Sequence, residues 1–445
     1  MDYSNTNKAQ PNGETDLTPA TKEALNKKGE KTNKGGFWSN LARNKITEKL
    51  RKLQFGHLVV EENGQQIRFG RDDESAIKVT VLNSNFWSDL AFGGATGGGE
   101  AYIRGYWQCD DIVGLIRLLL RNVEVLEGID GRSFGLVKLI DRVRHFTNRN
   151  TETGSASNIA AHYDLGNDFF ELFLDQKLMY SSAFYPSVET NLEAAATIKL
   201  ERICQKLNLS ADDTVLEIGT GWGGFAIYAA QNYGCHVTTT TISKEQHALA
   251  KQRIAEAGLD DKITLLLQDY RKLSGHYDKV VSIEMIEAVG HQFLDTYIQQ
   301  CSNLLKDDGE ILIQAITIRD QQYNKAIKQV DYIKKFIFPG GFLPSITRIS
   351  DSMNRVSDLK IVHLEDIGEH YARTLADWRE RFINNIDRVR EYGYPEEFIR
   401  RWLFYFCYCE GSFREAYIGV VQLMANKPRA RTPTFNSSIS KLTIE

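Results

Sequence analysis

The fold of this chain is decided by the stretch VLEIGTGWGGFA at residues 215–226. Its glycines Gly219, Gly221 and Gly224 have the spacing G-x-G-x-x-G, directly after a short apolar run that is typical of a buried strand. In this pattern the glycines let the backbone turn tightly and approach a ligand at the N-terminus of the next helix. The stretch therefore predicts a strand, a loop and a helix that bind a ligand built on adenosine.

Apolar strand-like runs and helical patterns alternate on both sides of this loop. Strands are expected at 214–218, 235–241, 262–267, 279–284 and 310–316, with an insertion at 320–358, a largely helical stretch at 370–415 and a last strand at 417–426. This alternation predicts an α/β fold, in which a Rossmann-like, doubly wound and mostly parallel sheet carries the site.

The composition changes along the chain predict five segments. We expect a disordered tail at 1–35, an α+β accessory domain at 36–130, a polar linker at 131–160, an α/β domain with the glycine loop at 161–430 and a tail at 431–445. In the accessory domain, Asn63-Gly64 predicts a hairpin, and the glycine-rich residues 93–111 are interpreted as a hinge before an apolar helix at 112–122.

Charge and cysteine content limit the classes of partner. A net charge of −4 argues against a general nucleic-acid-binding protein. The six cysteines form no C-x-x-C pair, so neither a metal site nor a disulfide framework is predicted. With no signal peptide or spanning segment recognised, we expect a cytoplasmic protein that is peripheral to the inner membrane face. The basic segment 37–55 is either an ordinary surface helix, with Leu41, Ile46, Leu50 and Leu53 on one face, or attracted to anionic lipid.

The acidic residue of the loop decides between two adenosine ligands. An NAD site has a carboxylate about 20 residues after the glycines, but threonines end the second strand here. Glu217 instead precedes the glycines, where a carboxylate favours the positive end of S-adenosylmethionine (SAM) over a pyrophosphate. Asp269 and Tyr270 follow the third strand, where they can bond and stack on adenine. Gln246, three residues after Ser243, is interpreted as a capping-box residue, a ribose contact, or both.

A set of longer motifs resembles one enzyme family. HYDLGNDFFELFLD (162–175), MYSSAFY (179–185), EMIEAVGH (284–291), IFPGGFLPS (337–345) and YCEGSFREAY (408–417) occur in the order found in cyclopropane-fatty-acyl-phospholipid synthases, and the match covers about residues 90–425. The resemblance implies methyl transfer from SAM to the double bond of an unsaturated phospholipid acyl chain at the membrane surface. A bound bicarbonate then takes a proton as the ring closes. A homodimer is also implied.

The resemblance also implies the residues of the site. Bicarbonate would be held by Ser182, Glu287, Gln314, Tyr371 and the Ile316 backbone, and Cys409 matches a cysteine once proposed as catalytic, although it is also interpreted as packing. His162 is expected to organise the site. The residues expected to bind SAM, by motif or by resemblance, are Tyr180, Ser181, Glu217, Gly219, Gly221, Gly223, Thr241, Ile242, Gln246, Asp269 and Tyr270.

Two positions leave the reaction open. The bacterial family commonly has Cys where this chain has Ser182 and His where it has Gln314. Both replacements keep hydrogen-bond donors, but they hold an anion differently. The step that depends on these two positions is ring closure. The first interpretation is that the ring closes. The second is methyl transfer that ends in a methyl- or methylene-branched acyl chain, and the third is a lipid-binding protein without turnover.

Overall fold

The computed structural model describes residues 36–71, 75–126 and 166–431. The predicted tail at 1–35, the linker at 131–160, His162 and residues 432–445 lie outside the described residues, and the domain boundaries stay a prediction. None of the helices in the described ranges has both the length and the apolar character needed to cross a bilayer.

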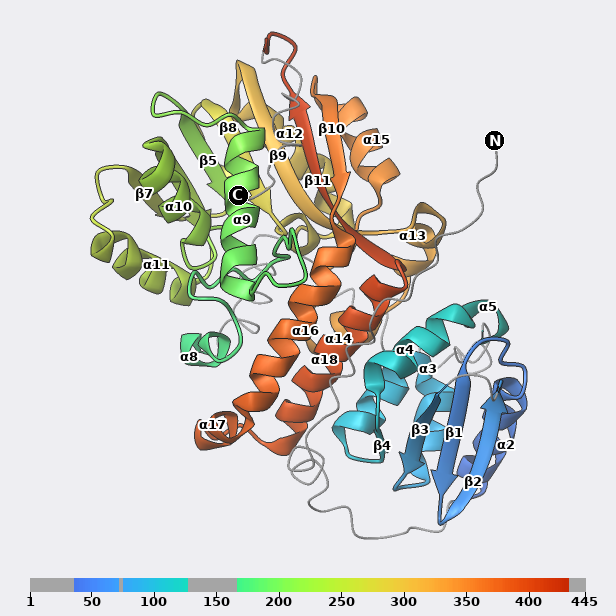
Figure 1. Cartoon of the computed structure of the whole chain (residues 1–445). Coiled ribbons are helices and arrows are strands. Elements are labelled where there is room, and N and C mark those ends of the chain that lie inside the picture. Colours follow the sequence, from blue (N-terminus) through green and yellow to red (C-terminus); the bar gives the residue numbers. More distant parts are fainter. Residues whose placement is uncertain (1–35, 72–74, 127–165, 432–445) are drawn as a thin grey trace, which may run out of the picture.

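The catalytic part is built on a seven-stranded sheet (Figure 1). Its strands are β5 (Thr214–Ile218), β6 (His236–Thr241), β7 (Ile263–Leu267), β8 (Tyr277–Ile283), β9 (Leu305–Ile318), β10 (Lys360–Asp366) and β11 (Ile418–Asn426). The order is β10-β11-β9-β8-β5-β6-β7, and the pairs from β9 to β7 are all parallel. The α/β, doubly wound fold predicted from the sequence is confirmed. Its strand order reverses between β5 and β8, where such sheets bind ligands.

The last strand expected from the sequence, at 417–426, is present as β11 but does not form an edge of the sheet. β11 lies inside the sheet, antiparallel to both β9 and β10, and β10 forms the edge. The strand at 360–366 is not among those expected from the sequence. Its side chains are partly or fully exposed, as an edge strand allows, so the segment lacks the continuous apolar run that marks a central parallel strand.

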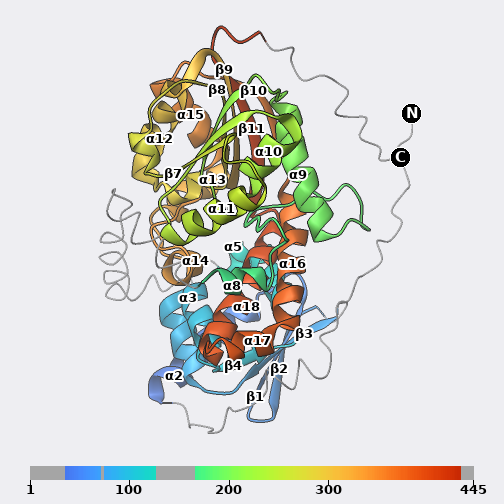
Figure 2. The ribbon, with the colours of Figure 1, turned by 90° about the vertical axis from the view of Figure 1, so that its left-hand side faces the viewer.

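Helices cover the sheet and connect it with the N-terminal part. Those of the catalytic part are α8 (Asn167–Glu171), α9 (Leu192–Lys206), α10 (Gly224–Tyr233), α11 (Lys244–Glu256), α12 (Leu294–Asn303), α13 (Asp320–Ala326), α14 (Tyr332–Phe336), α15 (Ile346–Val356), α16 (Gly368–Asn384), α17 (Ile386–Glu391) and α18 (Glu396–Arg414), with short 3-10 turns at Tyr270–Lys272, Ile286–Ala288 and His291–Phe293. Figure 2 shows α16 and α18 running from the large sheet to the N-terminal part. One hydrophobic core joins the two parts.

The N-terminal part is a four-stranded sheet with helices. The strands β1 (His57–Glu62), β2 (Gln65–Gly70), β3 (Ala76–Val81) and β4 (Trp107–Cys109) are ordered β2-β1-β3-β4, and the helices are α2 (Phe37–Leu50), α3 (Asn85–Ile103), α4 (Ile112–Arg121) and α5 (Val123–Leu126). Asn63 and Gly64 both have positive φ between β1 and β2, so the predicted hairpin is confirmed.

The glycine-rich residues are not a hinge. Residues 93–103 belong to α3, which bends at Gly94 and packs against α14 and α18. A Cβ at Gly99 would lie 2.6 Å from Tyr332 and 2.9 Å from Phe404, so the missing side chain permits this close approach. Composition alone suggested flexibility, whereas the tertiary contact uses the small size of glycine.

The predicted basic helix is present, but its buried face differs by one residue. Ile46, Leu50 and Leu53 are buried as expected, whereas Leu41 is 40% exposed. Ala42 and Ser39 are buried instead, one and two turns before Ile46. The helix therefore meets the core with smaller side chains at its N-terminal end than the leucine pattern indicated.

Candidate active site

The glycine loop leaves β5 in the geometry that its sequence requires. Gly219 has φ 103° and Gly221 has φ 54°, a region that favours glycine, and α10 begins at Gly224 after the left-handed Gly223. The amides of Gly219 and Thr220 both donate to the carbonyl of Thr240 on β6. No described atom lies within 4 Å of a Cβ built at Gly221, which leaves room for a ligand against the backbone.

Glu217 is buried at the end of β5, and the buried Lys199 is among the groups that act on its pKa. Its carboxyl accepts a hydrogen bond of 2.6 Å from Thr239, and burial raises its pKa to about 8. Lys199 of α9 is also buried and donates to the hydroxyl of Ser181 at 2.9 Å. Burial lowers the pKa of Lys199 to about 8, against the opposing effect of Glu284 and other carboxylates. A cation bound beside Glu217 would favour its ionised form.

The start of α11 confirms the helix cap expected at Ser243. The Ser243 hydroxyl accepts from the amide of Gln246 at 3.2 Å, and Thr241 donates to the Gln246 side chain at 2.8 Å. Gln246 therefore contacts Thr241 rather than completing the reciprocal capping box, and Ile242 is partly exposed between them. These residues line the end of β6, beside the glycine loop.

Asp269 and Tyr270 follow β7 as expected. Arg271 donates to both carboxyl oxygens of Asp269, at 2.9 and 2.6 Å. Burial acts to raise the pKa of Asp269, but the Arg271 guanidinium and amide hold it below the usual range. The ring of Tyr270 packs edge-on against Tyr297, with ring centroids 5.6 Å apart. Asp269 and Tyr270 lie at the same edge of the sheet as the glycine loop, because the carboxyl ends of parallel strands meet at one edge.

The residues expected to cradle an anion meet at the ends of β8 and β9, but a carboxyl group of the chain occupies their centre. The amide of Ser182 and the Nε2 of Gln314 both donate to Glu284 Oε1 at 2.8 Å. The Tyr371 hydroxyl lies beside the Glu284 carboxyl and acts to lower its pKa, against the larger effect of burial. The Ser182 hydroxyl donates instead to the neighbouring carbonyl of Ala183.

Glu287 lies beside this group in the turn after β8. One of its oxygens accepts from the amide of Ile316, the donor that the resemblance assigned to bicarbonate. Its other oxygen, Oε2, is buried and finds no hydrogen-bond partner among the described residues. Burial and the nearby carboxyl of Glu284 raise the pKa of Glu287 well above its usual range.

Aromatic rings surround the carboxyl pair. Tyr371 of α16 packs at 4.7 Å from Phe413 and at 5.8 Å from Trp378, measured between ring centroids. The hydroxyls of Tyr180 and Tyr405 are 3.1 Å apart. Such a lining excludes water and presents ring faces to a positive charge.

Cys409 of α18 lies close to this lining, on the side of Tyr371 and Tyr405. Burial raises the pKa of its thiol, so the thiol form predominates at neutral pH. The position supports the packing interpretation of this cysteine.

Two residues of the site were missed by sequence reasoning. Lys199 shows no signal beyond its place in a helix. Glu284 lies within the motif EMIEAVGH, which by itself indicates no role for it; it follows β8 directly and has φ 50°. Holding a glutamate in this left-handed region costs about 1–2 kcal/mol, and such strain concentrates at functional sites.

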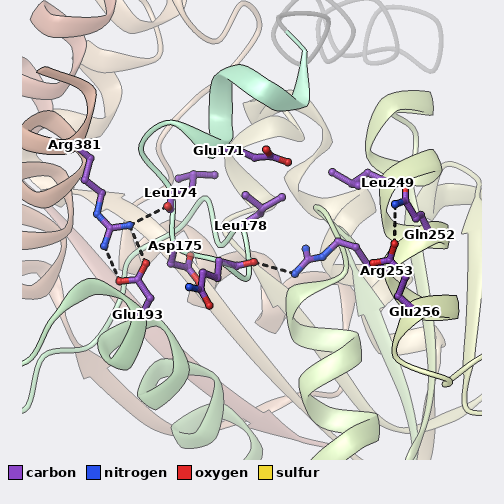
Figure 3. A pocket seen from close by; sticks show the side chains of 11 residues that line it. Glu171, Leu174, Asp175, Leu178, Glu193, Leu249, Gln252, Arg253, Glu256 and Arg381 are labelled. Carbon is purple, nitrogen blue, oxygen red and sulfur yellow. Dashed lines mark hydrogen bonds and ion pairs between the residues drawn. The ribbon is translucent and has the colours of Figure 1, made fainter. Parts of the chain in front are cut away.

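A separate cleft of about 520 Å³ lies between α8, α9, α11 and α16 (Figure 3). Arg381 pairs with Glu193 on one side, and Arg253 donates to backbone carbonyls, including that of Trp222 at 2.7 Å, on the other. None of the predicted site residues lines it, so the cleft is distinct from the carboxyl pair.

The chain matches a known protein family over more than half of its length. The family model for mycolic acid cyclopropane synthetase matches residues 150–423. The chain belongs to this family. The tuberculostearic acid methyltransferase UfaA1 of Mycobacterium tuberculosis is 37% identical over 336 residues, which are 74% of this chain and 78% of that protein.

Further relatives agree with this membership. Cyclopropane-fatty-acyl-phospholipid synthase of Escherichia coli is 35% identical over 352 residues, which are 78% of this chain and 87% of that protein. The solved mycolic acid cyclopropane synthase CmaA1, complexed with SAH and CTAB, has 29% identity and a TM-score of 0.57, and covers 61% of this chain and 98% of that one. The protein is a SAM-dependent methyltransferase of the cyclopropane synthase family, and its relatives modify lipids.

Proposed function

We propose that this protein transfers the methyl group of SAM to the double bond of an unsaturated phospholipid acyl chain and closes a cyclopropane ring. The observation that carries the proposal is the carboxyl pair Glu284 and Glu287, enclosed by aromatic rings at the sheet edge that carries the glycine loop. SAM supplies its own leaving group, so the protein has to exclude water, stabilise a carbocation and accept a proton. The site residues suit these three tasks.

The proposed SAM site is the edge formed by the ends of β5, β6 and β7. Glu217 would face the amino-acid end of SAM, with Tyr180 and Ser181 nearby, and Asp269 and Tyr270 would contact adenine. The acyl chain would enter along the rings of α16 and α18, with its double bond beside Tyr371. The buried, ring-lined surroundings favour an apolar chain over a polar substrate.

The described residues do not fit a separate bicarbonate ion. The Ile316 amide already donates to Glu287. Glu284 already accepts from the Ser182 amide and from Gln314, with the Tyr371 hydroxyl beside it. A further anion would meet two carboxyl groups in a site of low polarity, where like charges repel strongly. We therefore route no step through bicarbonate.

A methyl- or methylene-branched product is the second candidate. It is favoured by the similarity to UfaA1, which is a tuberculostearic acid methyltransferase by name. Both products require methyl transfer from SAM, and they differ in how the carbocation is resolved.

The experiment is mass spectrometry and NMR of fatty acid methyl esters from cells that express this chain with methyl-labelled methionine. A mass gain of one methylene and ring-proton signals would support cyclopropanation, whereas label in a branch would select the second candidate. No label in any lipid, with the protein present and folded, would refute both.

Contact with a membrane surface is supported by α2 and the residues after it. Phe37, Trp38 and Phe55 are 75%, 60% and 50% exposed, and Lys45 and Lys52 are exposed among them. Exposed aromatic and basic side chains together favour anionic lipid surfaces. Flotation with anionic liposomes should fall for the double variant Phe37→Ser/Trp38→Ser and remain for Val188→Ser, which removes an exposed apolar residue elsewhere. The homodimer and the cytoplasmic location stay predictions.

A further inference from the structure

The carboxyl group of Glu284 is held as a bound anion would be held. Its Oε1 accepts two hydrogen bonds of 2.8 Å, from the Ser182 amide and from Gln314, and Tyr371 adds a hydroxyl. These donors come from three separate segments of the fold. They are three of the five residues that the resemblance assigns to bicarbonate.

A chain of side chains behind Gln314 fixes the direction of its amide. Lys206 can only donate, and its ammonium lies 2.6 Å from the Gln422 carbonyl oxygen. Gln422 must then turn its NH2 group toward Gln314, whose oxygen accepts at 2.9 Å. Gln314 is left with its NH2 group facing Glu284. Glu365 anchors Lys206 at the far end. The ammonium group of Lys206 therefore determines that Gln314 presents its NH2 group, and not its oxygen, to Glu284.

The two neighbouring carboxyl groups are held differently. Glu284 accepts two hydrogen bonds of 2.8 Å and has the Tyr371 hydroxyl beside it, whereas Glu287 has the Ile316 amide and a buried oxygen without a described partner. Two neighbouring carboxyl groups do not both ionise readily in a buried site. Burial raises the pKa of both carboxyl groups, but the donors around Glu284 act against this effect more than the Ile316 amide does at Glu287. Of the two groups, Glu284 is therefore the carboxylate and Glu287 the neutral acid.

We propose that the Glu284 carboxylate is the built-in base of this enzyme and takes the proton lost from the transferred methyl group, in the role that the family resemblance gives to bicarbonate. The assignment rests on the proposed function. The alkene electron pair bonds to the methyl carbon while the carbon–sulfur pair leaves with S-adenosylhomocysteine. A C–H pair of the new methyl then closes the ring, and its proton passes to Glu284. In the branched alternative, a hydride shift comes first, and the same methyl proton passes to Glu284 as a methylene forms.

Two substitutions at Glu284 separate this role from a structural one. Glu284→Gln fills the space without a base, so we expect lipid product formation to fall about 100-fold or more. Glu284→Gly suits the positive φ and opens space, so added bicarbonate or formate should restore product at least about tenfold, and should not restore the Gln variant. Glu310→Gln, which removes a buried carboxylate paired with Lys279 at 2.6 Å, is the matched control.

The assay uses the purified full chain, unsaturated phospholipid vesicles and SAM with a trideuterated methyl group. In carbonate-free buffer the wild-type rate should stay within about twofold of the rate with bicarbonate, and the product should keep two of three deuterons. Melting temperatures and SAM affinity show whether each variant is folded.

Different failures are distinguishable in this design. A wild-type enzyme that needs bicarbonate, a Gln variant near wild-type activity, or a Gly variant that no anion restores would overturn the role of Glu284 while methyl transfer stands. A folded wild-type protein that transfers no label would overturn the proposed function, and this assignment with it.

Discussion

Adding one methyl group at Gly99 is expected to loosen the contact between the two parts of the molecule. The Cβ of Gly99→Ala would lie 2.6 Å from Tyr332 Cδ2 and 2.9 Å from Phe404 Cε1. Carbon atoms in ordinary contact are about 3.5–4.0 Å apart, so the rings must move by about 1 Å. Both rings are buried, and the Tyr332 hydroxyl is tied to the carbonyl of Arg401 at 2.8 Å.

The size of the effect follows from two opposing contributions. Overpacking a filled contact costs about 1–3 kcal/mol. Alanine in place of glycine in a helix returns about 0.5–1 kcal/mol. We expect a net loss of about 1–2 kcal/mol in the free energy of unfolding, which is a fall of roughly 1–2 °C in melting temperature for a protein of this size.

Gly93→Ala is the matched control, since it lies in the same helix and no described atom is within 4 Å of its Cβ. Thermal and urea unfolding of both variants should show Gly99→Ala below wild type and Gly93→Ala at or above it. If Gly99→Ala is as stable as Gly93→Ala, the close approach of α3 to α14 and α18 is not a constraint, and the reasoning is refuted.

Three further outcomes follow from the site and its surroundings. Because the pKa of Glu217 is raised to about 8, SAM binding near neutral pH should release protons. Calorimetry in buffers of different ionisation enthalpy should show this release for wild type and not for Glu217→Gln. A binding enthalpy of wild type that does not depend on the buffer would contradict it. Cys409→Ala should keep kcat/KM within about threefold, because a buried neutral thiol has no step to perform, and a loss of about 100-fold would return it to the mechanism. Burial lowers the pKa of His370, so the folded state binds its proton less readily than the unfolded chain does. The free energy of unfolding should therefore fall as the pH drops through the usual histidine range, and it should fall less steeply for His370→Asn. The same pH dependence in both proteins would show that another group causes the fall.

Local sequence predicted the features that depend on neighbouring residues. The strand, loop and helix around Gly219 and Gly221 were expected because strand-forming residues and positive-φ glycines act within a few positions. The Asn63-Gly64 hairpin was expected for the same reason. Central parallel strands were visible because both of their faces are buried, which requires continuous apolar runs.

Features that depend on distant partners were not visible. The edge strand β10 has partly exposed side chains, and its place beside β11 is set by pairing across the sheet. The glycines of α3 indicated flexibility until Tyr332 and Phe404 were placed against Gly99. The family motif identified Glu287. One sequence, however, does not show that Glu287 Oε2 lacks a hydrogen-bond partner among the described residues while the Glu284 carboxyl accepts hydrogen bonds.

The sequence by itself determined that this chain has an α/β nucleotide-binding domain, and its motifs determined the methyltransferase family. Only the tertiary structure decided what occupies the centre of the expected anion site. The donors of Glu284 come from the segment before α9, from β9 and from α16, and Lys206 and Gln422 orient one of them from α9 and β11. A hydrogen bond depends on the distance and direction between two groups, and folding sets both for residues that are far apart in the chain.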